Sequence, residues 1–234
     1  MWVRRLLRSL FALEELSVHD AADLEWQTLP ERVVVQLHAN RTPELEDLLE
    51  RHGFRVAVLA RHPLDVLISI LHFARHEPQT ANWLDGAFGD ERSILHATPT
   101  SRAFVRYATS RRARALLAIT PQWWDRADAR IRYEHLVADT RRELEMVAEA
   151  LDETPAKPYE QVLEEVTFGA LQQEAENVHF WRGSAGGWNE LLTIPVARKL
   201  VDAHADVLAK LGYLDFPDER TARERWAELL IQPR

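Results

Sequence analysis

A predicted strand, a sharp turn and a helix in the first third of the chain constrain its fold more than any other feature. Apolar and β-branched residues from Val56 to Ala60 form the strand, and Arg61 follows at its carboxyl end. Pro63 then opens a helical pattern that carries Asp65 and Ser69. In open α/β sheets, anionic ligands bind at this edge. The segment predicts an anion site, although an ordinary turn in which Arg61 pairs with Asp65 explains the same residues.

Composition narrows the class of protein. The 234 residues suit one α/β domain, 1–234, which is large enough to bury a full core. The net charge of −8 excludes an extended nucleic-acid or acidic-membrane surface, while a local basic pocket for one anion stays open. The absence of cysteine excludes disulfides, thiolate catalysis and Cys-based zinc sites, and it fits a cytoplasmic location. No apolar run is long enough to cross a bilayer.

Helical and strand patterns alternate along the chain, as in α/β proteins. Trp2, Leu6 and Leu10 recur at helical spacing and predict an amphipathic first helix with basic residues on its outer face. Thr140 and Glu143 match a capping box at the start of another helix. The other predicted elements are a strand over 33–38, a helix over 43–51, a loop over 80–100, helices over 100–118 and from 121, a strand over 129–136, and a helix over 193–212.

The segment around Arg61 resembles the 3′-phosphate-binding segment of the sulfotransferases that use 3′-phosphoadenosine 5′-phosphosulfate. In that family a Pro, an Asp and a Ser follow the Arg, as Pro63, Asp65 and Ser69 follow Arg61. The resemblance implies that Arg61 and Ser69 bind the 3′-phosphate of the nucleotide. It also implies a three-layer fold with a mainly parallel sheet flanked by helices, of the P-loop nucleoside triphosphatase-like type.

The strand over 33–38 resembles the family strand that ends in Lys-Thr-His and supplies the catalytic base. Here it ends in Gln36-Leu37-His38, so the histidine is kept and glutamine replaces the lysine. Imidazole suits this role, because its ordinary pKa lies near neutrality and an attacking acceptor oxygen must lose a proton. A histidine with only a structural role is the alternative at position 38.

Three aromatic residues match family positions that lie against the adenine. Tyr133 opens the sequence Tyr-Glu-His-Leu, which resembles the family's Tyr-Glu-Asp-Leu, and Phe168 follows a threonine where the family has Ser-Phe. Trp2 falls on the family tryptophan that stacks on adenine. The resemblance implies that Trp2, Tyr133 and Phe168 bind the base, since aromatic rings suit a purine face. A core tyrosine is the alternative at position 133.

A glycine-rich segment near the end of the chain resembles the family's Arg-Lys-Gly, two variable residues, then Gly-Asp-Trp. Aligning Trp188 with the family tryptophan places Gly183 and Gly186 on the two glycines and Arg182 on the lysine, whereas Trp181 replaces the arginine. The resemblance implies that Arg182 and Gly183 also bind the 3′-phosphate. Loop amides together with one cation suit such a ligand.

The family's opening strand, with its Pro-Lys-Ser-Gly-Thr-Thr-Trp loop around the 5′-phosphosulfate, has no counterpart before Trp2. A start assigned too late, a decayed gene and a repurposed domain each explain this difference. Without that loop and strand, the chain as given is expected to be poorly stable and nearly inactive.

The predicted function is transfer of a sulfuryl group from 3′-phosphoadenosine 5′-phosphosulfate to a hydroxyl or amine of a small-molecule or glycan acceptor, without a metal. A catalytically impaired domain that still binds adenosine 3′,5′-bisphosphate is one alternative. A nucleotide kinase-like phosphotransferase is another, and the lack of a Walker-type loop disfavours it. Trp123 and Trp124 suit either an acceptor pocket or the core. A homodimer is left open.

Overall fold

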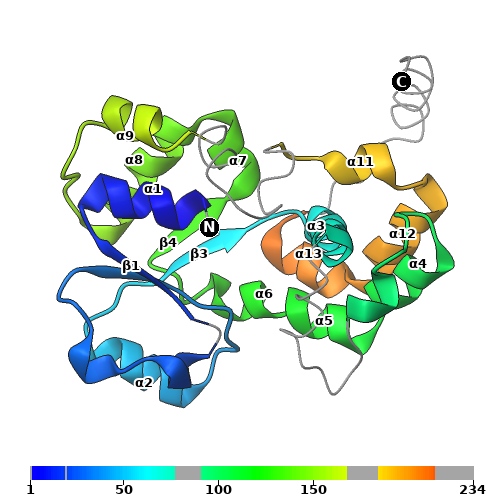
Figure 1. The fold of residues 1–234 in the computed structure, drawn as a ribbon, viewed down its shortest axis with the longest axis horizontal. Coiled ribbons are helices and arrows are strands. Elements are labelled where there is room, and N and C mark those ends of the chain that lie inside the picture. Colours follow the sequence, from blue (N-terminus) through cyan, green and yellow to red (C-terminus); the bar gives the residue numbers. More distant parts are fainter. Residues whose placement is uncertain (1, 19, 77–90, 168–183, 214–234) are drawn as a thin grey trace. The chain divides into compact units, whose positions relative to one another are not determined.

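The computed structural model describes residues 2–18, 20–76, 91–167 and 184–213 (Figure 1). The chain forms two compact units. The first comprises Met1–Ala60 and Gln122–Gly183, and the second comprises Arg61–Pro121 and Ser184–Arg234. Each unit therefore combines two stretches that are far apart in the sequence.

The described strands all lie in the first unit and pair in parallel, as predicted for this α/β chain. β1 (Glu14–Ser17) pairs with β2 (Val33–Gln36), and β3 (Ala57–Ala60) pairs with β4 (Ala129–Arg132). Ser17 lies opposite Gln36 and Ala60 lies opposite Arg132, so the two strands of each pair end level. The sequence does not predict β1, because Glu-Glu-Leu-Ser has little of the apolar and β-branched character of a strand.

The first helix, α1 (Trp2–Phe11), is amphipathic as predicted. Its outer face carries three arginines, which lie 3.4, 3.4 and 3.8 Å from the carboxylate of Glu15. The side chains of Arg4 and Glu15 are only 13% and 20% exposed, so the cost of removing these charges from water offsets much of their attraction. Burying one leucine fully contributes about 1.5–3 kcal/mol, so the apolar face dominates the docking of α1. The buried residues of this face are Leu6, Leu7, Leu10 and Phe11.

The core of the first unit lies between α1, β4 and three later helices. These are α7 (Tyr133–Ala138), α8 (Thr140–Leu151) and α9 (Tyr159–Glu165). Figure 1 shows α1 beside α9. Ile131, Leu136, Leu144 and Val162 belong to the same buried cluster as the apolar face of α1.

The connection from β2 to β3 contains α2 (Pro43–Arg51), and local signals define both of its ends. The hydroxyl of Thr42 accepts a hydrogen bond from the Leu45 amide at 3.2 Å, and Gly53 adopts a φ of +67° after the helix. Two single turns of 3₁₀ helix, Ala21–Asp23 and Trp26–Thr28, lie between β1 and β2. α6 (Ile119–Trp124) crosses the boundary between the two units.

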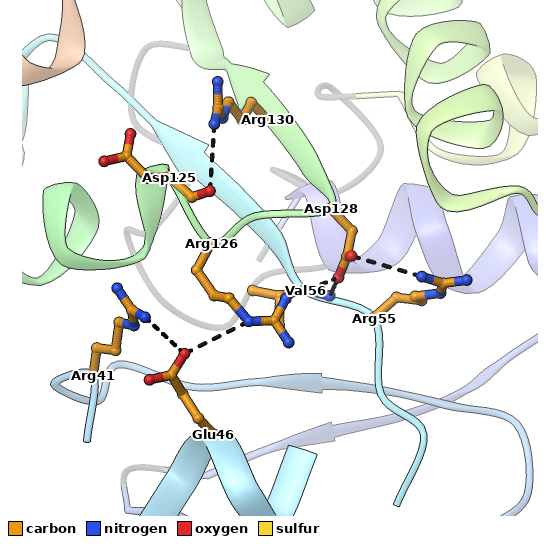
Figure 2. A network of polar contacts seen from close by, with 8 residues as sticks. All are labelled: Arg41, Glu46, Arg55, Val56, Asp125, Arg126, Asp128 and Arg130. Atoms are coloured by element: carbon orange, nitrogen blue, oxygen red, sulfur yellow. Dashed lines mark hydrogen bonds and ion pairs between the residues drawn. The ribbon is translucent and has the colours of Figure 1, made fainter. Parts of the chain in front are cut away.

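A polar network holds the amino ends of β3 and β4 together (Figure 2). The Val56 amide donates to Oδ2 of Asp128 at 2.7 Å, and the Val56 carbonyl accepts from the amides of Asp128 and Ala129. Arg55 and Arg126 approach the same carboxylate at 3.7 and 3.8 Å. Bonds to the backbone therefore fix the register of the β3–β4 pair.

The described part of the second unit is helical. Its elements are α3 (Pro63–His76), a 3₁₀ turn (Glu91–Ile94), α4 (Arg102–Ala108), α5 (Arg111–Leu117), α11 (Gly187–Leu191), α12 (Ile194–Ala203) and α13 (Ala205–Leu211). The helix predicted over 193–212 ends at Gly212 as expected, with φ of +74°, but it is broken at His204. The ring of His204 is fully buried, and its Nε2 atom lies 2.7 Å from the carbonyl oxygen of Ala108.

A buried ion pair links the 3₁₀ turn to α4 and α5 in the second unit. Oε1 of Glu91 accepts from the Tyr107 hydroxyl at 2.7 Å and from Nε of Arg112 at 3.1 Å. Burial and the neighbouring carboxylate raise the pKa of Tyr107, so its hydroxyl remains a donor. Oε2 of Glu91 and one terminal nitrogen of Arg112 are buried without a hydrogen-bond partner among the described residues.

Candidate functional site

His38 lies two residues beyond the carboxyl end of β2, and its side chain is exposed. Its Nε2 atom is 3.2 Å from Nε2 of Gln36, the last residue of the strand. A neutral imidazole accepts a hydrogen bond from a side-chain amide, and a protonated one donates to the amide oxygen after a half-turn of that amide. Gln36 can therefore orient the ring in both of its protonation states.

Two residues of α6 fix the loop that leaves β2. The carbonyl of Ala39 accepts a hydrogen bond from Nε1 of Trp123 at 2.9 Å. The amide oxygen of Gln122 accepts from the backbone amide of Arg41 at 3.0 Å. Trp123 and Trp124 are each only 8% exposed, so both tryptophans belong to the core.

Two of the three residues assigned to the adenine contact each other. The rings of Trp2 and Tyr133 meet edge to face, with their centroids 6.4 Å apart. Nε1 of Trp2 also donates to the carbonyl of Val166 at 3.3 Å. Val166 precedes Phe168 by two positions, and Phe168 itself lies outside the described residues. Three segments that are distant in the sequence therefore converge on Trp2.

Tyr133 lies at the start of a helix, so the strand predicted over 129–136 is wrong beyond Arg132. β4 ends at Arg132 and α7 begins at the next residue. The backbone amide of Arg132 donates to Oε1 of Glu143 at 3.0 Å. At the end of β4, this amide therefore bonds to a side chain and not to another strand. Leu136 lies on α7, and its side chain is buried in the core of the first unit.

The predicted capping box of Thr140 and Glu143 is also wrong. Asp139 is the N-cap of α8, and its Oδ1 atom accepts from the Arg142 amide at 3.0 Å. The Thr140 hydroxyl instead donates to the carbonyl of Leu136 at 2.8 Å. Glu143 is buried, and its carboxylate accepts a hydrogen bond from the backbone amide of Arg132 at the end of β4 instead of capping α8.

The turn between β3 and α3 meets the glycine-rich loop in the second unit. Nε of Arg61 lies 3.9 Å from Oδ2 of Asp65, which is the pairing considered as an alternative to an anion site. The same carboxylate accepts hydrogen bonds from the amides of Gly186 at 2.7 Å and Trp188 at 2.9 Å. Asp65 therefore connects two segments that the resemblance assigns to one phosphate.

The remaining residues predicted for the phosphate are Ser69, Arg182 and Gly183. Ser69 is exposed on α3. Arg182 and Gly183 lie outside the described residues. The assignment of Arg61, Ser69 and the loop to a 3′-phosphate stays a prediction.

Sequence reasoning did not identify two residues that each hold a loop, Asp65 in the second unit and Trp123 in the first. Asp65 appeared only as a motif residue, and Trp123 only as one of two adjacent tryptophans. The one local signal for Asp65 is an acidic residue in the first turn of α3, which also suits an ordinary helix start. Trp123 carries no local signal for its bond to Ala39, because the partner lies 84 positions away.

Within the described ranges, 2–18, 20–76, 91–167 and 184–213, no three His, Asp or Glu side chains are grouped closely enough to hold a metal ion. In the same part of the chain, no helix combines the length and the apolar character needed to cross a membrane.

Comparisons with known proteins identify the fold. No protein-family model and no curated protein matches the sequence. The structure is similar to mouse sulfotransferase SULT7A1 complexed with PAP, with a TM-score of 0.65 and 15% identity over 96% of this chain and 82% of that one. It is also similar to a retinol dehydratase in complex with androsterone and the inactive cofactor PAP, with a TM-score of 0.52 and 18% identity over 83% of this chain and 58% of that one. This chain therefore has the sulfotransferase fold, in agreement with the resemblance of its motifs.

Proposed function

We propose that the chain is a sulfotransferase that moves a sulfuryl group from 3′-phosphoadenosine 5′-phosphosulfate to a hydroxyl or amine of a small-molecule or glycan acceptor. The contact of Trp2 with Tyr133 and with the Val166 carbonyl carries this proposal. It brings together the three segments that the motifs assign to the adenine. Both structural neighbours are complexed with PAP, adenosine 3′,5′-bisphosphate, which is the nucleotide that remains after sulfuryl transfer.

The second unit supplies the proposed phosphate site. Arg61 provides a guanidinium directly after β3, and the loop around Gly186 provides backbone amides. The contacts of Asp65 with Arg61, Gly186 and Trp188 support a shared site for these segments. A guanidinium and backbone amides form charge-assisted hydrogen bonds to a phosphate.

The first unit supplies the proposed base, His38. The acceptor oxygen attacks sulfur and forms the new S–O bond, while the S–O bond to the 5′-phosphate breaks and the nucleotide leaves with its electron pair. With the Gln36 amide turned so that its oxygen accepts from the Nε2–H group of His38, the ring lone pair lies on Nδ1, so the acceptor proton moves to Nδ1 and the imidazole becomes imidazolium. The amide of Gln36, 3.2 Å from Nε2, supports this role because it can hold the Nε2–H group before and after Nδ1 is protonated.

Nucleotide binding is the first test of the proposal. Titration calorimetry should show that adenosine 3′,5′-bisphosphate binds at least about tenfold more tightly than adenosine 5′-monophosphate, because each charge-assisted bond to the 3′-phosphate contributes about 1.5–3 kcal/mol. The two ligands share the adenosine and the 5′-phosphate and differ only at the 3′ position. Equal affinities would refute the phosphate site.

Sulfuryl transfer to a panel of phenols, alcohols and amines is the second test. In a protein extended with the family's opening strand and phosphosulfate loop, the form used for every turnover measurement, His38→Ala should lower turnover by about 10²–10⁴-fold and leave nucleotide affinity nearly unchanged. His96→Ala, at another exposed histidine, is the matched control and should retain turnover. A His38→Ala protein that loses folding and nucleotide binding together would show that His38 is structural. An extended protein that keeps His38 and binds the bisphosphate, but transfers sulfuryl to no acceptor, would favour the catalytically impaired alternative.

A further inference from the structure

A buried carboxylate on α3 makes the main connection to the glycine-rich loop. The Asp65 side chain is 1% exposed, and it accepts hydrogen bonds from the amides of Gly186 at 2.7 Å and Trp188 at 2.9 Å. The contact with Nε of Arg61 is longer, at 3.9 Å. The two loop amides are therefore the main partners of Asp65, and an isolated charge at this depth would be costly without them.

A second contact, between Trp188 and His62, holds the same loop. Gly186 adopts a φ of +78°, a left-handed conformation, immediately before α11. The indole of Trp188 stacks on the His62 ring, with centroids 4.8 Å apart and an angle of 20° between the rings. Nδ1 of His62 accepts from the Leu64 amide at 3.2 Å, so the ring belongs to the start of α3. The loop thus has one defined position relative to α3.

We propose that Asp65 is a positioning residue for the phosphate site, an inference that rests on the proposed function. Its carboxylate would repel a phosphate, so Asp65 is not itself a ligand. The Asp65 carboxylate holds residues 186–188 beside the turn that carries Arg61. It thereby fixes the separation between the loop amides and the Arg61 guanidinium, which would both contact one anion. A phosphate that uses both segments needs them at a fixed separation before it binds.

Asp65→Asn is the variant that tests this role. It replaces one acceptor oxygen with an N–H₂ group, so that one loop amide faces a donor instead of an acceptor. The affinity for adenosine 3′,5′-bisphosphate should fall by about tenfold or more, while the affinity for adenosine 5′-monophosphate should change by less than about twofold. Hydrogen exchange at Gly186 and Trp188 in the ligand-free protein should become faster. A variant that keeps the wild-type ratio of the two affinities would overturn the proposal.

Asp128→Asn is the matched control. Its Oδ2 atom also accepts a hydrogen bond from a backbone amide, that of Val56 at 2.7 Å, but it does so at the amino end of β3. This variant should keep the wild-type ratio of the two nucleotide affinities even where it lowers stability. A ratio that falls equally in both variants would mean that general destabilisation explains the effect, and it would overturn the positioning role.

Two further outcomes separate the possible failures. A wild-type protein without preference for the bisphosphate would refute the proposed function itself, whereas a preference retained by Asp65→Asn would refute only the role of Asp65. If Asp65→Asn does not fold, Gly186→Ala tests the same loop. The nearest atom to the added Cβ is Nδ2 of Asn189 at 3.9 Å, so the variant strains only the φ of +78°. It should weaken bisphosphate binding by about tenfold without changing monophosphate binding, and an unchanged ratio would again overturn the proposal.

Discussion

The hydrogen bond between the Val56 amide and Asp128 should contribute more to stability than the ion pairs around it (Figure 2). The bond is 2.7 Å long, and the Asp128 side chain is 21% exposed. The ion pairs with Arg55 and Arg126 are 3.7 and 3.8 Å long, and these arginines are 62% and 34% exposed. Water and salt screen such exposed guanidinium groups, whereas the backbone amide has no other acceptor among the described contacts.

Three substitutions at these contacts should lower the free energy of unfolding by different amounts. Asp128→Ala should lower it by about 1.5–3 kcal/mol, the range for a hydrogen bond to a charged group. Asp128→Asn keeps a neutral acceptor oxygen and should lower it by about half as much. Arg55→Ala should lower it by less than about 1 kcal/mol, because it removes only a long and exposed ion pair.

Urea unfolding followed by circular dichroism, at about 0.1 M and about 1 M NaCl, separates the two contributions because the Debye length falls from about 10 to about 3 Å. The loss in Asp128→Ala should be the same at both salt concentrations if the amide bond dominates. A loss that disappears at the higher salt concentration, or that is no larger than the loss in Arg55→Ala, would show that the ion pairs stabilise the strand ends and would refute this reasoning.

Three other predictions concern the loop after β2 and two buried groups. Trp123→Phe removes the bond to the Ala39 carbonyl and should lower turnover but keep nucleotide affinity, whereas Trp124→Phe, the control, should leave both unchanged. Glu91→Gln leaves the guanidinium of Arg112 buried without its counter-ion and should cost about 3–5 kcal/mol in urea unfolding, and a cost below about 1 kcal/mol would contradict a buried pair. Burial lowers the pKa of His204 below its ordinary value of 6.5, so the unfolded state binds more protons and stability should fall as the pH decreases below that value. In His204→Phe this acid-dependent loss should be smaller than in wild type, which melting curves between neutral and mildly acid pH would reveal.

The elements predicted best are those whose signals lie within a few residues. The hydroxyl of Thr42, the proline that follows it and Gly53 define α2 at both ends, and the predicted and observed bounds agree. The apolar spacing of α1 likewise predicts the face that is buried. In both helices, local propensity and burial favour the same structure, and this consistency is what makes a short segment predictable.

The elements predicted worst depend on partners elsewhere in the chain. β1 is a polar segment that becomes a strand through pairing with β2 and through the arginines of α1 around Glu15. Glu143 matched a local helix cap, yet its carboxylate binds the Arg132 amide and helps to end β4 there. His204 breaks a continuous helical pattern because its buried ring binds the carbonyl of Ala108, 96 positions away. Tertiary contacts decided each of these cases.

The same distinction explains why the motifs indicate candidate ligand residues but not the residues that hold the loops around them. We propose that Arg61 contacts the nucleotide and that His38 contacts the acceptor, and a ligand constrains both the type and the spacing of such residues. A positioning residue needs only a side chain that reaches one particular backbone group. Asp65 does so for loop amides 121 and 123 positions away, and Trp123 for a carbonyl 84 positions away. No local pattern encodes such separations, so these residues become visible only when the folded chain brings the partners together.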